Sequence, residues 1–354
     1  MGRTRAPIAP IAGMPLLPDM PDMPVTRRAF GSLACGAAVG SVVPSAFSAP
    51  GTTAWLLATG YPTENFHTLN LVAMARDVEA ATGGRLRIEV RPGGSMFALN
   101  AIRAAVQDGK AESGEAIMSS MVADVPIAGA DSVPFITQSY DDAQRLWRIQ
   151  RPLVERAFAQ RGLRVLHAVA WPPQGLYANR PLGGMADLRG LRMRAYNATT
   201  ARIATLVGAV PVDVPATELD KALAEGRIDC MLTSAVTGVE SRVWQSMRFF
   251  YDINAWFPKN LVFANAQAWE ALAPPLRDAL ATASAAAESR GWAASAAAAA
   301  RSMDELRRNG VKAEPVPYLF SRDLRRLGEH FSLDWIKQVG VDANAIFIPY
   351  FDRH

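Results

Sequence analysis

Apolar positions beyond residue 50 alternate between two periods, and this indicates strands separated by helices. Trp55 to Thr59 is a short apolar run, and Arg85 to Val90 alternates polar and apolar residues, as a strand with one buried face does. Between them, Leu69 to Ala81 has helical spacing and ends before Gly83 and Gly84. The pattern predicts a strand, a helix and a second strand.

The same alternation continues along the chain. Ser139 with Asp142, and Thr217 with Asp220, have the spacing of helix capping boxes. This order of elements is typical of an α/β fold and excludes a repeat or a helical bundle. The further elements that we expect are helices over Ala98–Val106, Ser139–Gln160 and Thr217–Glu225, and strands over Ala116–Met118, Leu163–Ala170, Leu191–Ala195 and Ile228–Leu232.

One predicted helix is exceptional in its length. Pro274 and Pro275 open an alanine-rich segment that Asn309 and Gly310 close, and both pairs suit those ends of a helix. At a rise of about 1.5 Å per residue, an unbroken helix would span about 50 Å and would lie across two domains. The alternative is two helices that bend at the glycine of Ser289–Gly291.

Composition and charge exclude several classes of protein. The chain has 354 residues, of which 50% are hydrophobic and 20% charged, so it is long enough for two domains and is not disordered as a whole. Two cysteines exclude a disulfide scaffold. The net charge is +4, and half of that excess comes from four arginines and two aspartates before residue 50. The remaining charge gives no reason to expect a nucleic-acid partner.

The first 49 residues are predicted to be an export signal. Arg27 and Arg28 precede a charge-free run of mostly small residues that ends at Ala49. The paired arginines resemble the twin-arginine signal, and an ordinary secretory signal is the alternative. Cys35 lies inside the run and is expected to be removed, which leaves Cys230 as the single cysteine of a periplasmic protein. No later stretch has the length and apolarity of a membrane span.

The sequence beyond the signal contains no recognisable catalytic constellation. It lacks the HExxH and CxxC metal motifs, a Walker loop, and the G-x-S-x-G and G-x-G-x-x-G patterns. His167 lies inside an apolar strand and is interpreted as a core histidine rather than a base. We therefore expect neither enzymatic activity nor a metal or other cofactor.

The most informative stretch is Asp187–Ala195, with the sequence DLRGLRMRA. On a strand, Arg192 and Arg194 share one face, and periodicity alone favours a solvent-exposed face. The segment nevertheless resembles the carboxylate-binding motif of the DctP-type solute-binding proteins of TRAP transporters. The resemblance continues through GAVPV at 208–212, ELDKAL at 218–223 and GRID at 226–229.

This resemblance implies a two-lobed, clamshell periplasmic binding protein. Such a protein would pass an organic acid to the small and large permease subunits of a TRAP transporter. The chain would cross between the lobes more than once, and the long helix would brace both. The divisions that we expect are the signal over 1–49, one lobe over 50–171 and 259–298, and the other over 172–258 and 299–354.

The resemblance also assigns roles to individual residues. Arg194 would form a bidentate salt bridge to the ligand carboxylate, because guanidinium presents two parallel donors. Asn197 matches a ligand-contacting asparagine, and Gln174 stands where sialic-acid members of the family have a second arginine. Thr233 or Ser234 replaces an asparagine of those members. Further candidates, from strand ends and aromatic residues near the crossovers, are Asn65, Phe66, His67, Phe97, Glu115, Trp171, Tyr177, Tyr196 and Trp256.

One arginine among several aromatic side chains favours a monocarboxylate with a planar or apolar body, such as an aromatic or 2-oxo acid. A dicarboxylate or a sugar acid is the alternative. A periplasmic enzyme, or a sensor or scaffold on the same fold, remains an alternative to a transport function.

Overall fold

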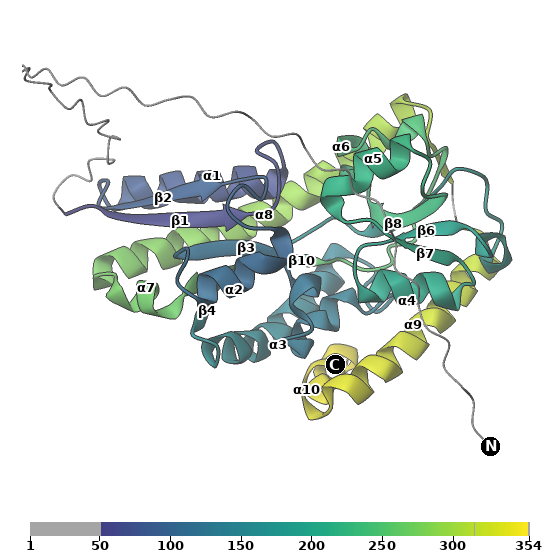
Figure 1. Ribbon diagram of the computed structural model, residues 1–354. Helices are drawn as coiled ribbons and strands as arrows, with labels where there is room; N and C mark the ends of the chain where they lie inside the picture. Colours follow the sequence, from purple (N-terminus) through teal and green to yellow (C-terminus); the bar gives the residue numbers. More distant parts are fainter. Residues whose placement is uncertain (1–50, 315, 353–354) are drawn as a thin grey trace, which may run out of the picture. The chain divides into compact units, whose positions relative to one another are not determined.

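The computed structural model describes residues 51–314 and 316–352, so the predicted export signal over 1–49 lies outside the described residues. All of the described residues belong to one compact unit. Within it the chain forms two β-sheets with helices packed around them, which confirms the α/β, two-lobed fold (Figure 1).

The first sheet has five strands in the order β2-β1-β3-β10-β4. Strand β1 is parallel to β2 and β3, whereas β10 is antiparallel to both β3 and β4. Strand β10 comes late in the chain, so the chain returns to this sheet after it has built most of the second one. The strands are β1 (Thr53–Thr59), β2 (Leu86–Arg91), β3 (Ser113–Ile117), β4 (Leu163–Ala170) and β10 (Lys259–Asn265).

The second sheet has six strands in the order β11-β9-β5-β8-β6-β7. Strand β6, which carries the arginine motif, is parallel to β7 and β8, and β5 is antiparallel to β8 and β9. The chain enters this sheet directly after β4, leaves it before β10 and returns to it for β11 after α8. The strands are β5 (Gln174–Ala178), β6 (Arg192–Ala195), β7 (Val210–Asp213), β8 (Cys230–Ser234), β9 (Phe249–Tyr251) and β11 (Lys312–Glu314).

Ten α-helices occur among the described residues, and none of them is long and apolar enough to cross a membrane. The α-helices are α1 (Phe66–Ala81), α2 (Ile102–Gln107), α3 (Tyr140–Ala159), α4 (Ala198–Leu206), α5 (Leu219–Ala224), α6 (Ala235–Glu240), α7 (Ala266–Ala271), α8 (Pro274–Arg308), α9 (Tyr318–Val339) and α10 (Val341–Phe351). Short 3-10 helices are η1 (Leu99–Ala101), η2 (Met118–Met121), η3 (Pro126–Ser132), η4 (Met185–Leu188), η5 (Ala216–Glu218) and η6 (Val243–Gln245).

Helix α8 is one unbroken helix of 35 residues, so the alternative of a bend at Ser289–Gly291 is wrong. It contacts α1 and β4 on the side of the first sheet and α6 and β11 on the side of the second (Figure 1). Side chains also fix it, because Asn70 donates to the Ala287 carbonyl and Trp292 donates to the Ala168 carbonyl, both at 2.9 Å. The prediction of one helix across both lobes is thereby confirmed.

Gly291 allows α8 to lie close to β4 rather than bending it. A β-carbon at this position would lie 2.4 Å from Val169 Cγ2 and 2.8 Å from Asn70 Nδ2. Replacing Gly291 with alanine is therefore expected to lower the free energy of unfolding by about 1–3 kcal/mol, the usual effect of overpacking, although alanine favours helix. Chemical denaturation measures the change, and an unchanged or raised stability would contradict this close packing.

Two local expectations need correction. Thr217 does not cap α5, because the chain first forms the 3-10 helix η5, and no side chain caps α5 at its N-cap residue Glu218. Strand β3 occupies Ser113–Ile117, earlier than the expected 116–118, because polar Ser113 and Glu115 are buried in it and interrupt the apolar run. The C-terminal helices α9 and α10 pack chiefly against η3 and α3.

His167 is a core histidine, as its apolar strand indicates. It is fully buried in β4, and its Nδ1 atom lies 2.9 Å from Ser284 Oγ of α8. Burial lowers the pKa of His167 to about 3 from an ordinary value of 6.5. Between these two values the unfolded chain binds a proton that the folded chain does not, so the free energy of unfolding falls as the pH decreases.

This linkage predicts that His167 removes about 2 kcal/mol of stability between pH 6.5 and pH 5, since one pKa unit corresponds to about 1.4 kcal/mol. We expect a His167→Asn variant to lose that part of the pH dependence when denaturation is followed at both pH values. The exposed His330 provides the control, because His330→Asn should keep the slope of the parent protein. Equal slopes for all three proteins would contradict the prediction.

Candidate functional site

A small cavity lies where strand ends of the two sheets face each other. Strands β1, β3, β6 and β8 all end beside it, which is the usual place for ligands in open α/β sheets. Its volume is about 90 Å³. It is lined by Tyr61, Leu99, Ile117, Trp171, Gln174, Arg194, Tyr196, Ala216, Thr233, Ser234, Thr237 and Pro258. Six predicted site residues therefore meet in one place: Arg194, Gln174, Thr233, Ser234, Trp171 and Tyr196.

Arg194 is held so that its two terminal nitrogens remain free. Its side chain is 3% exposed, its Nε donates to the Val214 carbonyl at 3.0 Å, and its guanidinium lies 4.9 Å from the centre of the Tyr196 ring. Neither terminal nitrogen has a hydrogen-bond or ion-pair partner among the described residues. Burial lowers the pKa of Arg194 to about 10, so the group is still cationic at neutral pH. The cavity therefore contains a buried positive charge with two donors to spare.

Arg192 differs from Arg194 although both lie on β6. It is half exposed and forms a bidentate pair with Asp229, with Nε and Nη2 at 2.9 and 2.7 Å from the two carboxylate oxygens. The solvent-exposed interpretation thus holds for Arg192 and fails for Arg194. Arg192 pairs with β7 alone, at the start of the strand, whereas Arg194 pairs with both β7 and β8. The side chain of Arg194 is therefore in the interior of the sheet and is buried.

Two aromatic rings of the cavity wall are held by one asparagine. Tyr61 and Trp171 both donate to Asn260 Oδ1, at 3.2 and 2.8 Å, and their ring centres are 5.1 Å apart. Burial raises the pKa of Tyr61 well above 10, so its hydroxyl stays protonated and donates. Asn260 is the second residue of β10 and is completely buried.

The predicted residues His67, Phe66 and Glu115 form a layer behind this wall. His67 packs against Trp171 with ring centres 4.5 Å apart, and its Nδ1 lies 3.3 Å from Glu115 Oε1. Phe66 packs edge-on against Trp171. Burial opposes ionisation of Glu115, but the neighbouring His67 ring and the hydrogen bond from the Thr59 hydroxyl outweigh it and lower the pKa of Glu115 below the ordinary 4.5. This layer supports the wall and does not line the cavity.

Five other predicted residues lie elsewhere. Asn65 caps α1 and donates to Glu240 Oε1 at 2.9 Å. Phe97 packs against the main core, and Leu99, two residues later, lines the cavity in its place. Trp256 is fully buried, and its backbone carbonyl accepts from the backbone N–H of Gln174. Asn197 caps α4 and lines a different cavity. Tyr177 is likewise buried in the core and donates to the Ser234 carbonyl.

Sequence reasoning missed Tyr61, Asn260 and Thr237. Only Asn260 left a signal, because Lys259 and Asn260 are two polar residues at the start of an apolar run that becomes β10. Tyr61 follows a strand and Thr237 lies in the short helix α6 just past another, where such residues are ordinary. Among residues 51–314 and 316–352, no three His, Cys, Asp or Glu side chains are grouped as metal ligands would be.

Comparisons with known proteins agree with this geometry. A structure of DctP6, a Bordetella pertussis extracytoplasmic solute receptor binding pyroglutamic acid, is 36% identical and superposes with a TM-score of 0.83, covering 85% of this chain and 100% of that one. A marine metagenome TRAP solute-binding protein specific for pyroglutamate is 35% identical, with a TM-score of 0.82 and coverage of 85% and 99%. A Chromohalobacter salexigens TRAP protein with bound D-glucuronate is 20% identical with a TM-score of 0.78, covering 84% of this chain and 99% of that one, and shows a common fold alone.

A curated relative from Albidiferax ferrireducens, described as a solute-binding protein, is 24% identical over 172 residues. This match covers 48% of the chain and only half the length of the relative. Residues 57–326, which include every residue that lines the cavity and all of both sheets except the start of β1, match the family described as bacterial extracellular solute-binding protein, family 7. With most of the chain matched, and with a buried arginine at the meeting point of two α/β lobes, the protein belongs to the DctP family of extracellular solute-binding proteins.

Proposed function

We propose that this protein is the solute-binding component of a TRAP transporter and that its solute is pyroglutamate or a closely similar monocarboxylic acid. The observation that carries the proposal is the guanidinium of Arg194, which presents two free donors to the cavity. Such a fork matches the two oxygens of a carboxylate, and the Val214 carbonyl and the Tyr196 ring hold it in place before the ligand arrives.

The other residues of the cavity suit an uncharged body attached to that carboxylate. Arg194 is the only charged side chain among the described residues that line the cavity, so a second carboxylate would have no cation to pair with. The cavity is small, with a volume of about 90 Å³, and this favours a small acid over a hexuronate.

A five-membered lactam fits these surroundings in its shape and its polarity. The rings of Tyr61, Trp171 and Tyr196 offer flat apolar surfaces, and the hydroxyls of Thr233 and Thr237 can pair with the lactam N–H and C=O groups. Related proteins that are 35–36% identical bind pyroglutamate by their own descriptions. The expectation of a monocarboxylate is kept, and a lactam ring takes the place of the aromatic or 2-oxo body.

The remaining parts of the proposal concern export and partners. We infer that residues 1–49 direct the chain to the periplasm by the twin-arginine route and that the small and large TRAP permease subunits receive the solute. The lobe boundaries proposed are 50–171 with 259–298 for one lobe and 172–258 with 299–354 for the other. The protein is proposed to act by binding and release, without turnover of the solute.

Thermal denaturation over a panel of acids tests the choice of solute. L-Pyroglutamate should raise the Tm by mass action. L-Proline lacks the lactam carbonyl and carries an ammonium group, L-glutamate carries an ammonium group and a second carboxylate, and D-glucuronate is larger, so each should have a much smaller effect. Mass spectrometry of acids that co-purify with the protein should find the same compound. Stabilisation by glutamate or glucuronate, with none by pyroglutamate, would overturn the proposal.

A further inference from the structure

One buried oxygen atom holds two walls of the solute cavity. Asn260 lies in β10, between β3 and β4 of the first sheet, and is completely buried. Its Oδ1 atom accepts from the Trp171 indole at 2.8 Å and from the Tyr61 hydroxyl at 3.2 Å. An indole N–H can only donate, so the amide atom beside it is the oxygen, and this contact determines the orientation of the amide.

The rings of Tyr61 and Trp171 depend on this oxygen for their placement. In the part of the chain that the structure describes, it is the only atom to which both groups donate. Their backbones are anchored separately. The Tyr61 carbonyl accepts from the Gly93 N–H, and the Trp171 N–H donates to the Pro258 carbonyl, both at 2.7 Å. Removal of the shared acceptor would therefore release the rings without releasing the chain.

Both rings line the solute cavity, whereas Asn260 does not. Their centres are 5.1 Å apart and their planes are inclined by 59°, so together they form a corner. Tyr61 follows β1 and Trp171 follows β4, so the corner belongs to the first sheet, while Arg194 reaches the cavity from the second. With the solute carboxylate at Arg194, the shape of the corner limits the body that the carboxylate can carry.

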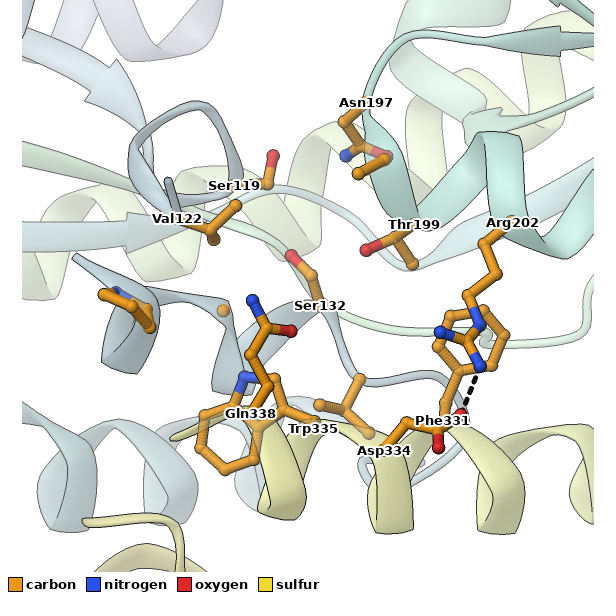
Figure 2. Close-up of a pocket in the computed structure, with 14 residues that line it drawn as sticks. Ser119, Val122, Ser132, Asn197, Thr199, Arg202, Phe331, Asp334, Trp335 and Gln338 are labelled. Carbon is orange, nitrogen blue, oxygen red and sulfur yellow. Dashed lines mark hydrogen bonds and ion pairs between the residues drawn. The ribbon is translucent and has the colours of Figure 1, made fainter. Parts of the chain in front are cut away.

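Asn197, the asparagine to which the family resemblance points, has a different role. It caps α4 and lies at another cavity, together with Ser119 and Thr199 (Figure 2). Tyr61 and Trp171 do not line that cavity. Asn260 lies outside the motif and is nevertheless the asparagine that is placed to shape the solute cavity.

We propose that Asn260 is a positioning residue that determines which size of solute the protein accepts. This inference rests on the proposed function. Rings that are held before the solute arrives lower the ordering cost of binding, and a corner of fixed shape rejects broader acids. Since Asn260 does not line the cavity, it acts on the solute through Tyr61 and Trp171.

Asn260→Leu tests the proposal, because leucine is similar in size to asparagine and has no acceptor. Isothermal titration calorimetry compares L-pyroglutamate with indole-2-carboxylate, which keeps a carboxylate beside a ring N–H but has a broader flat body. We expect the variant to bind pyroglutamate about tenfold more weakly, because two buried donors lose their acceptor and the wall is no longer held in place. It should bind indole-2-carboxylate at least as tightly as the parent protein does.

Asn265→Ala is the matched control. Asn265 is the other buried asparagine of β10, but its amide donates to the Val106 carbonyl and caps α7. This variant should lower the Tm and leave the ratio of the two affinities unchanged. A change in that ratio confined to Asn260→Leu therefore reports on the wall and not on general stability.

A measurement without solute tests the hydrogen bond itself. In protein that carries ¹⁵N-labelled tryptophan, comparison with Trp171→Phe assigns the indole N–H signal of Trp171. The proton signal should move upfield in Asn260→Leu and stay in place in Asn265→Ala. If Asn260→Leu does not fold, Tyr61→Phe is the second variant. It removes the tether of one ring and should reduce the preference for pyroglutamate by a smaller factor.

Two results would overturn the role of Asn260. One is a Trp171 signal that does not move in Asn260→Leu, and the other is an unchanged preference between the two acids in that variant, or in Tyr61→Phe if it takes its place. Failure of the proposed function is distinguishable from both, because the parent protein itself would then not bind pyroglutamate.

Discussion

Replacing Arg194 with alanine is expected to lower the affinity for pyroglutamate by about two to three and a half orders of magnitude, which corresponds to about 3–5 kcal/mol. The loss is large because the carboxylate would remain buried among the aromatic walls with no cation and without the two donors of the guanidinium fork. Isothermal titration calorimetry measures the change. The fold should survive the substitution. In the ligand-free protein Arg194 contacts only the Val214 carbonyl and the Tyr196 ring through its guanidinium, and burial already disfavours its charge.

Two variants serve as controls. Arg192→Ala removes the same side chain from the same strand, but Arg192 is half exposed and pairs with Asp229, so pyroglutamate affinity should change little. Arg194→Lys keeps a positive charge and loses the planar fork, and should weaken binding about tenfold or more, since a hydrogen bond to a charged group is worth about 1.5–3 kcal/mol. Near-parental affinity in Arg194→Ala would contradict the assigned role of Arg194.

The second large effect concerns stability and involves Lys259. Lys259 and Asp131 are both completely buried, with Nζ 3.6 Å from Asp131 Oδ2. Burial lowers the pKa of Lys259 and raises that of Asp131, so each charge depends on the other. In Lys259→Met, Asp131 remains a buried carboxylate that has lost its cation. Its remaining partners are the backbone N–H at position 259 and the hydroxyl of Ser132. We expect the free energy of unfolding to fall by about 3–5 kcal/mol, as measured by chemical denaturation.

A double variant distinguishes the lost ion pair from a simple packing defect. Lys259→Met with Asp131→Asn leaves no charge behind and should recover most of the lost stability. If the double variant is as unstable as Lys259→Met alone, the effect comes from packing, and the interpretation as a buried ion pair is wrong. Lys259 is the first residue of β10 and precedes Asn260, so this pair also anchors the strand that holds the aromatic wall.

The fold could be predicted as far as local pattern determines it. The long helix was predictable because prolines and an Asn-Gly pair delimit an alanine-rich run, and the buried strand β4 because it is a continuous apolar run. The position of β10 between β3 and β4 was not predictable, because strand order depends on contacts between residues far apart in the chain. The same reason accounts for Gly291, which has the local character of a helix breaker and is a packing contact in the fold.

The candidate site was predictable where a motif marks it. The residues around Arg194 were found through the family pattern, and six of the predicted residues do line one cavity. Asn197 was assigned to the site because it matches a ligand-contacting asparagine of the family, but the turn after β6 and its capping of α4 direct it to a different cavity. His67 and Glu115 are polar residues beside strand ends, as a site requires, yet they pair with each other behind the wall. Which polar groups face a cavity is decided by tertiary packing.

A crystal structure of the protein with bound L-pyroglutamate tests the central claim most directly. The account predicts that the ligand occupies the cavity between the two sheets, with both carboxylate oxygens about 2.7–2.9 Å from the terminal nitrogens of Arg194 and the lactam ring against Tyr61 and Trp171. A ligand whose carboxylate is bound away from Arg194, or whose lactam group faces that arginine, would contradict it.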